Sequence, residues 1–489
     1  MKRIVLLAAL ASLGAPPAGA TSQPAGLPAC ALGRLPAALR TTVPNAIAKA
    51  QRRFGASLRG ASASERGHAE ATFAAAEAAY LYGMPTVRLR LTVQRFPVNQ
   101  FVGIGALAGP DDRAVVAPNR DTLYSVSQLD LDDGPLVIDA PATGGRYSVI
   151  QLLDAYTNDF AYIGAGSERD AARAVAVAPP GWQGALPDGV QLIHSPTKLV
   201  WLLGRTLIDG PNDLPAAKEV LAGYAITPLE RWSPTQHRAP LILDAFPGAQ
   251  APVQLPAEVG FYDALGQALA ADPPPPADAC ALRAFAAAGI GPGLMPSSAG
   301  GELDARALTA AAVAGRRLVD AAVTTTRRYN QRRSNGWSLL TGDIGRFGVD
   351  YAGRAMVADA GLGANTPEQA LYPNTDTDRD GRPLDGRHDY VVTFPRGELP
   401  PVRAFWSLTV YDRAGFLAPN AIDRYAIGDR TAGLRYGPGR SLAVRVSHRR
   451  PRSNWLPAPR GRFSLWLRLY EPKPAAARRW TPPTVTRVD

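Results

Sequence analysis

The densest group of residues able to do chemistry is the run Pro118–Ser125, which reads PNRDTLYS. Asn119, Arg120, Asp121 and Tyr124 stand there, where a polar stretch becomes β-prone. An arginine beside a carboxylate and a tyrosine has the parts to hold an anionic ligand, and a carboxylate or phenol held near an arginine can move a proton. The run therefore predicts a site in which Asp121 and Tyr124 transfer protons while Asn119 and Arg120 bind ligand.

Two further stretches supply side chains that can join this group. Gly145–Tyr147 contains Arg146, and Gln151–Asn158 contains Asp154. If these stretches lie on neighbouring strands, Arg146 helps to hold an anion and Asp154 is a third catalytic candidate. The opposing interpretation is a buried structural network, in which Asn and Asp cap turns and arginine pairs with a carboxylate. The residues alone leave both open.

A second group, aromatic and polar, lies near the C-terminus around Phe405–Ser407. Exposed tryptophan and tyrosine beside asparagine and arginine suit stacking on sugar faces. Aromatic side chains at strand spacing also fill cores, and that interpretation is the commoner one. The ligand-binding candidates in this group are Asn420, Arg424, Tyr425 and Trp455.

Asp376, Asp378 and Asp380 begin a DxDxDG motif of the kind found in calcium loops. The twelfth position is Arg387 instead of a bidentate glutamate, so an aspartate-rich turn is the preferred interpretation. We therefore predict no metal and no other cofactor. The chain also lacks GxSxG, HExxH, Walker A and CxxC sequences, which removes the motif support for those enzyme classes.

Composition limits the partners. The 489 residues include 53 Lys and Arg against 42 Asp and Glu, a net charge of +11, and 46% are hydrophobic. Only five of the basic residues are lysines, and the arginines are scattered without a basic run, so we expect no nucleic-acid partner. The length suits two to three domains.

The N-terminus carries an export pattern. Lys2 and Arg3 precede the apolar stretch Ile4–Leu13, and Ala18–Ala20 supplies small residues for cleavage. This predicts a secretory signal peptide over residues 1–20, the alternative being an uncleaved N-terminal anchor. No later run of eighteen apolar residues follows, so we expect no membrane span after cleavage and a periplasmic or secreted protein.

Cys30 and Cys280 are the two cysteines of the chain. In an oxidising compartment they could form a disulfide that ties the N-terminal region to the middle of the chain. Each also stands among alanine and leucine, which suits a buried free thiol.

Short β-prone runs broken by turn residues, with helical patterns between them, predict the elements that position these residues. The chain is expected to be mainly β with a helical middle segment (α+β), built from two antiparallel β-sandwich or barrel-like domains. A helix over His68–Tyr82 is expected to stop at Gly83 and Pro85. Alternation along Phe463–Tyr470 predicts two different strand faces. The expected organisation is a signal peptide at 1–20, a loosely ordered tail at 21–66 with one helix near 45–54, an N-terminal β-domain at 67–212, a helical connecting region at 213–360 and a C-terminal β-sandwich at 372–480.

Several motifs resemble a pair of bacterial domains, the domains of unknown function 1254 and 1214. The first is resembled at Pro118–Ser125, Gly145–Gly164, Ser195–Thr197 and Gly204–Gly210, and the second at Phe405–Asp412, Asn420–Arg430, Asn454–Pro459 and Leu467–Pro472. The likeness covers about residues 70 to 480. It departs at Gly437–Leu442, where the family more often has an Asp-Gly-Ser-Leu run. The resemblance implies an exported protein with two β-sandwich modules around a helical segment, and it implies no reaction.

Together these observations predict an exported protein that binds or processes a polar envelope or extracellular ligand, such as a glycan or a carboxylate, in the N-terminal β-domain. The alternative is a non-catalytic structural or partner-binding envelope protein. The sequence does not decide whether the protein is an enzyme, and it leaves a homo-oligomer open.

Overall fold

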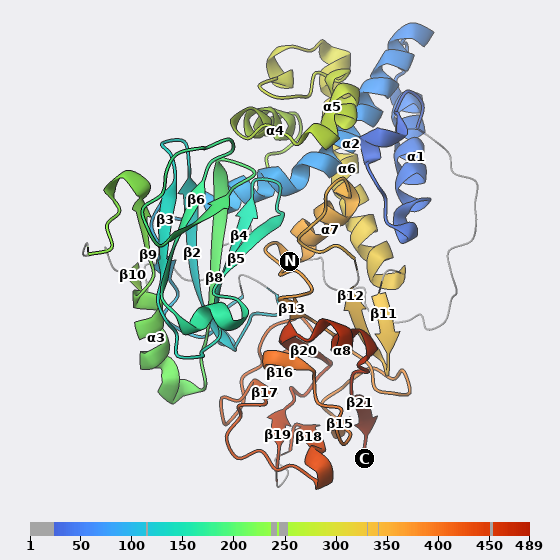
Figure 1. The fold of residues 1–489 in the computed structure, drawn as a ribbon. Coiled ribbons are helices and arrows are strands. Elements are labelled where there is room, and N and C mark those ends of the chain that lie inside the picture. The colour runs from blue at the N-terminus through green and yellow to red at the C-terminus, as the bar shows by residue number, and fades with distance from the viewer. Residues whose placement is uncertain are drawn as a thin grey trace.

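The computed structural model describes residues 24–113, 116–235, 242–243, 253–329, 331–340, 342–449 and 453–489. The predicted signal peptide at 1–20 lies outside these residues. The described chain forms three parts: an N-terminal β-module, a helical part beside it and a C-terminal β-module (Figure 1).

The helical part combines the first helices of the chain with those of the middle segment, and one core joins them. α2 packs against α1, α4, α6 and α7, so it is the central helix. The helices are α1 (Thr42–Ser57), α2 (Ala63–Val93), α4 (Gly260–Ala271), α5 (Ala279–Ala286), α6 (Glu302–Tyr329) and α7 (Tyr351–Gly361). Among the described residues, no helix is long and apolar enough to cross a membrane.

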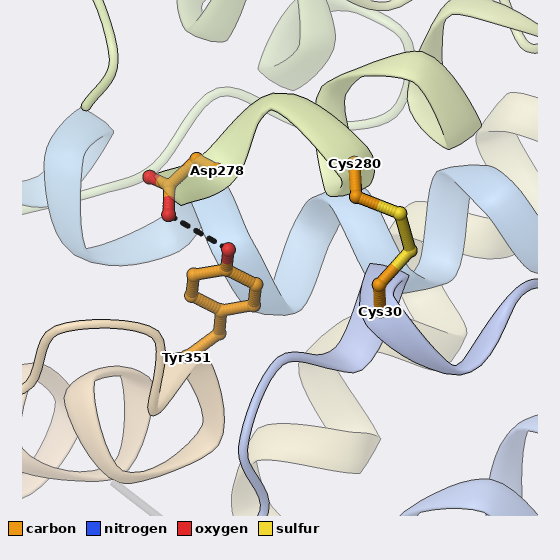
Figure 2. Close-up of a disulfide and its surroundings, with 4 residues drawn as sticks. All are labelled: Cys30, Asp278, Cys280 and Tyr351. Carbon is orange, nitrogen blue, oxygen red and sulfur yellow. Dashed lines mark hydrogen bonds between the residues drawn. A yellow bond between two sulfur atoms is a disulfide. The ribbon is translucent and has the colours of Figure 1, made fainter. Parts of the chain in front are cut away.

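Residues 24–66 differ from the loosely ordered tail that we expected. The helix expected near 45–54 is present within α1, but the segment is packed, because Leu32, Leu39 and Val43 are buried in the helical core. Cys30 and Cys280 form a disulfide, and Asp278, two residues before Cys280, accepts a 2.7 Å hydrogen bond from the Tyr351 hydroxyl (Figure 2). Apolar burial and the disulfide thus order a segment whose composition suggested a tail.

The expected end of the second helix at Gly83 and Pro85 is wrong, because α2 continues to Val93 with Pro85 inside it. A Cβ at Gly83 would lie 2.4 Å from the Leu265 side chain of α4. Gly83 therefore serves the close approach of two helices rather than a helix end. Burial of the α2 side chains outweighs the hydrogen bond that Pro85 cannot donate.

The N-terminal β-module is a sandwich of two sheets that share one core. The six-stranded sheet has the order β10-β1-β2-β8-β4-β5, and the four-stranded sheet has the order β7-β6-β3-β9. The second face of the six-stranded sheet packs against the helical core through Val126, Leu153 and Trp201. The strands are β1 (Val102–Gly103), β2 (Thr122–Asp130), β3 (Leu136–Ala140), β4 (Ser148–Asp154), β5 (Asp159–Ile163), β6 (Arg173–Ala178), β7 (Val190–His194), β8 (Leu199–Leu207), β9 (Ala225–Pro228) and β10 (Ile242–Leu243), with α3 (Leu214–Ala222) between β8 and β9.

The C-terminal module is a second sandwich, in which a seven-stranded sheet packs on the sheet β19-β18-β15-β21. Along β20, Leu465, Leu467 and Leu469 enter this core, which confirms the two strand faces. The strands are β11 (Gln331–Ser334), β12 (Trp337–Leu340), β13 (Ala370–Leu371), β14 (Asn374–Thr375), β15 (Tyr390–Phe394), β16 (Val402–Asp412), β17 (Ala426–Gly428), β18 (Leu442–Ser447), β19 (Trp455–Pro457), β20 (Phe463–Pro472) and β21 (Thr484–Arg487), with α8 at Pro474–Arg479.

The described residues form a mixed α+β fold, with 33% helix and 25% strand, so "mainly β" is wrong. Their four sheets are open and rich in antiparallel pairs, and they close into no barrel. Strand texture in the sequence indicated the two sandwiches correctly. It underestimated helix because the N-terminal residues join the helical part.

Candidate functional site

The outer face of the six-stranded sheet changes from apolar to polar near the C-terminal end of β8. Leu199, Trp201 and Leu203 point to this face and pack on the helical core. Arg205 is the next residue in the same alternation, and its pairing partner on β2 is Tyr124. A charged side chain thus occupies a position that the pattern of β8 would give to an apolar residue.

Arg205 is 6% exposed and is held by neutral oxygens. Its guanidinium donates to Gln151 Oε1 at 2.6 Å, to Asn365 Oδ1 at 3.2 Å and to the carbonyl of Gly363 at 2.9 Å. Among the described residues, no carboxylate lies within ion-pair distance of it. Because a buried charge is costly without a counter-charge, this guanidinium is a strong candidate to meet an anion.

Tyr124 and Tyr372 lie beside Arg205 and are half-buried. The Arg205 guanidinium is 5.6 Å from the centre of the Tyr124 ring. The Tyr372 hydroxyl accepts a 2.7 Å hydrogen bond from Asn365, whereas the Tyr124 hydroxyl forms no hydrogen bond with any described residue. Burial raises the pKa of Tyr372, and the charge of Arg205 opposes this. A phenolic donor without a partner therefore stands next to a buried cation.

The C-terminal module has its own polar face, which points toward the region of Arg205 and Tyr372. Ser407 and Tyr411 on β16, with Arg468 on β20, point away from the apolar core of that module. Arg468 is 4% exposed and donates to Thr409 Oγ1, to the Tyr411 hydroxyl and to the Ala117 carbonyl. It too meets only neutral oxygens.

The run around Asn119 forms the seam between the two modules. The Ser407 hydroxyl donates to Asp121 at 2.6 Å, and Asn119 donates to the Tyr470 hydroxyl at 2.9 Å. The Tyr411 hydroxyl donates to the carbonyl of residue 118 at 2.6 Å. Motif residues quoted separately for the two domains are therefore in direct contact.

Arg354 provides a useful comparison with Arg205. It is 1% exposed and, within the described chain, also has no carboxylate at ion-pair distance. Its guanidinium lies 5.3 to 5.7 Å from the ring centres of Tyr82, Tyr156 and Tyr351, which are all buried. Rings on three sides stabilise that cation away from solvent. Arg205 differs because Tyr124 and Tyr372 beside it are only half-buried.

Arg146 and Asp154 lie apart from this cluster in structural arrangements of their own. Arg146 forms a two-pronged ion pair with Asp213, which lowers the pKa of that carboxyl. Asp154 accepts hydrogen bonds from the backbone of Tyr156 and Asn158 in the β4–β5 turn, and burial raises its pKa. Their catalytic and binding roles stay predictions, and the turn and ion-pair contacts agree with the structural alternative.

The remaining candidates divide between the seam and the C-terminal module. Arg120 donates to the Ala108 carbonyl and lies 4.9 Å from the centre of the Tyr425 ring. Arg424 donates to the Trp455 carbonyl at 3.1 Å, and Asn420 accepts hydrogen bonds within its own turn. The Trp455 indole donates to a strand carbonyl. Arg120 and Tyr425 thus meet, while the other three hold loops together.

The aspartate-rich loop has turn geometry. Asp378 Oδ1 accepts hydrogen bonds from the backbone N–H groups of Asp380 and Arg382, each at 2.9 Å. Among the described residues, no group of three or more His, Cys, Asp or Glu side chains is placed to hold a metal ion. The loop therefore lacks the clustered carboxylates of an EF-hand site.

Sequence reasoning missed Arg205, Arg468, Gln151 as a bridging group, and Tyr372. Arg205 and Arg468 do lie inside the motifs GRTLIDG and LRLYEP. The available signal was an arginine at a position where the strand alternation calls for an apolar residue. Charged side chains are rarely buried without a functional or structural partner, so this position could have been singled out.

Comparisons with known proteins agree with the division into an N-terminal and a C-terminal β-module. Residues 98–228 match "Protein of unknown function (DUF1254)" and residues 369–474 match "Protein of unknown function (DUF1214)". The chain therefore belongs to the proteins that carry these two domains, in this order. The sequence motifs had indicated the same pair. No curated protein matches the chain.

Two solved structures are similar. The crystal structure of the VPA0106 protein from Vibrio parahaemolyticus has 21% identity and a TM-score of 0.66, covering 86% of this chain and 100% of its own. This likeness shows a shared fold. An uncharacterised protein from Burkholderia cenocepacia has 13% identity and a TM-score of 0.40, covering 92% of this chain and 99% of its own.

Proposed function

We propose that this protein binds a small carboxylate-bearing ligand, such as a uronate sugar, between its two β-modules. The observation that carries the proposal is Arg205, a buried guanidinium held by neutral oxygens beside the Tyr124 hydroxyl, which has no hydrogen-bond partner among the described residues. A ligand carboxylate would supply the counter-charge and accept from the phenol. The arrangement is a binding site first; a reaction is not part of the proposal.

An exported location fits this ligand class. The disulfide between Cys30 and Cys280 indicates an oxidising compartment. We therefore place the protein in the periplasm or outside the cell, where a polar envelope fragment is a suitable ligand.

A second candidate function is a purely structural or partner-binding role. It is favoured by the seam contacts, because Asp121 and Asn119 are both satisfied by side chains of the C-terminal module. On this account the polar face joins two modules and meets no small molecule.

A thermal-shift screen separates the two candidates. The panel holds galacturonate, succinate, citrate and benzoate, with galactose and sodium chloride as carboxylate-free controls. A ligand at about 100 times its Kd adds about 2.7 kcal/mol to the free energy of unfolding. We expect a carboxylate to raise the Tm of the wild type.

Two arginine variants locate the effect. Arg205→Gln should lose the carboxylate-dependent shift. Arg354→Gln removes an equally buried guanidinium outside the seam and should keep the shift, even if its own Tm is lower. A wild-type Tm that no carboxylate raises would favour the structural role.

A further inference from the structure

A buried relay connects Arg205 to Asp159 at the start of β5. Gln151 accepts from Arg205 through Oε1 at 2.6 Å and donates through Nε2 to Asp159 Oδ1 at 2.6 Å. The Tyr162 hydroxyl donates to the other oxygen of Asp159 at 2.8 Å. Nε2 also donates to the Ala364 carbonyl at 3.3 Å, so this carbonyl and the carboxylate together fix which way the Gln151 amide points.

Asp159 also lies against Gly345, in the segment that precedes α7. Its backbone N–H donates to the Gly345 carbonyl at 2.6 Å, and a Cβ at Gly345, where φ is 76°, would lie 2.3 Å from Asp159 Oδ2. Thr366 donates from its backbone to Tyr162. Residues 363 and 365 supply oxygens to Arg205, so Asp159 is linked to the cation through Gln151 and to its cover through Tyr162 and Thr366.

We propose that Asp159 is the positioning residue that couples anion binding at Arg205 to the uptake of one proton. The inference rests on the proposed function. Because the Ala364 carbonyl also holds Nε2, the Gln151 amide keeps Oε1 on Arg205 when Asp159 takes a proton. The coupling is therefore electrostatic: a ligand carboxylate beside Arg205 offsets the positive charge that favours the ionised form of Asp159.

The charges around Asp159 also favour its protonation when an anion binds. Burial raises the pKa of Asp159 to about 7, although hydrogen bonds from Gln151 and Tyr162 oppose this. Around it, Arg205 on β8 favours the ionised form and Asp154 at the end of β4 disfavours it. Adding a ligand anion beside Arg205 favours the neutral carboxyl further.

The two segments on either side of α7 add little charge of their own at this point. The Gly345 carbonyl accepts from the Asp159 backbone, and the Thr366 N–H donates to the Tyr162 hydroxyl. Arg346 and Glu368, which flank these positions, form an exposed ion pair with each other at 3.2 Å. The titration near neutral pH is therefore assigned to Asp159.

Thermodynamic linkage between proton binding and ligand binding fixes the direction of the pH dependence. If the complex holds one more proton than the free protein, affinity rises as pH falls through the pKa of Asp159, by at most about tenfold per pH unit. By reciprocity, the ligand raises the pKa of Asp159 by the same coupling.

Calorimetric titration with galacturonate at pH 6 and pH 8 tests the proposal. We expect about three- to tenfold tighter binding at pH 6 in the wild type, and binding heats in two buffers of different ionisation enthalpy that report proton uptake. Asp159→Asn should bind equally well at both pH values. Asp133→Asn, which removes an exposed carboxylate, should keep the wild-type pH dependence.

The failures are distinguishable. Galacturonate that binds the wild type equally at pH 6 and pH 8, without proton uptake, overturns the role of Asp159 and leaves the anion site standing. Absence of binding at both pH values contradicts the proposed function and overturns the inference that rests on it. The buffer comparison uses the wild type, so it shows whether binding takes up a proton even if Asp159→Asn fails to fold.

Discussion

The hydroxyl of Ser407 donates a 2.6 Å hydrogen bond to a carboxylate oxygen of Asp121, although 286 residues separate them in the chain. Both side chains are buried. This contact joins the entrance of β2 in one sandwich to the middle of β16 in the other. The two domains therefore form one unit at the face that carries Arg205 and Arg468.

The seam contact should be worth measurable stability. Ser407→Ala leaves a buried acceptor of Asp121 unsatisfied, and we expect a loss of about 1–3 kcal/mol in the free energy of unfolding. Asp121→Asn should cost a similar amount, and the double variant should cost about 1 kcal/mol less than the sum. Urea unfolding measures all three. Ser464→Ala, on β20 but half-buried, is the control and should add to Asp121→Asn; full additivity for Ser407 would contradict the contact.

The disulfide should stabilise the helical part. It closes a loop of 250 residues, so replacing Cys30 and Cys280 together by serine should cost about 3–5 kcal/mol. Urea unfolding with and without reductant checks this. Reductant should lower the stability of the wild type to that of the double variant and should leave the variant unchanged. A wild type that is insensitive to full reduction would contradict the expectation.

Glu77 on α2 should destabilise the folded state at alkaline pH. It is 2% exposed, and burial raises the pKa of its carboxyl to about 8, against about 4.3 when unfolded. The folded state then holds an extra proton between these values, so its contribution to stability is greatest at acidic pH and is lost as pH rises toward 8. Glu77→Gln should gain about 2–5 kcal/mol at pH 8 and little at pH 4.

Chemical denaturation of Glu77→Gln at pH 4, 6 and 8 measures the effect as a difference from the wild type. Glu219→Gln, which changes an exposed carboxylate, should give no such pH-dependent gain. A Glu77→Gln difference that is constant across pH would show that the pKa of Glu77 is the same in the folded and unfolded states, which contradicts the raised value.

Local patterns explain why much of the fold was predictable. β20 extends only two residues beyond its predicted range, because the alternation of buried and less buried side chains is visible in its own sequence. α2 was cut short because a local pattern cannot report that Gly83 packs on Leu265. Helix-stop rules consider Pro85 alone. In the folded protein, the burial of the side chains around Pro85 outweighs the lost hydrogen bond.

The site was less predictable for a physical reason. Asn119 and Asp121 were singled out because they lie in a dense polar run, but their partners lie hundreds of residues away in the other module. Arg205 was missed because its neighbours in β8 are apolar, which directed attention to packing. Residues that meet only through tertiary contacts leave no spacing to recognise.

The central claim is that a ligand carboxylate binds between Arg205 and Tyr124. Calorimetric titration of galacturonate at pH 6 into Tyr124→Phe tests it most directly, because this change removes one hydroxyl and keeps the ring over Arg205. We predict a Tm of the free variant equal to that of the wild type and affinity weakened about tenfold or more, as expected for a hydrogen bond to a charged group. Wild-type affinity in both Tyr124→Phe and Arg205→Gln would contradict the account.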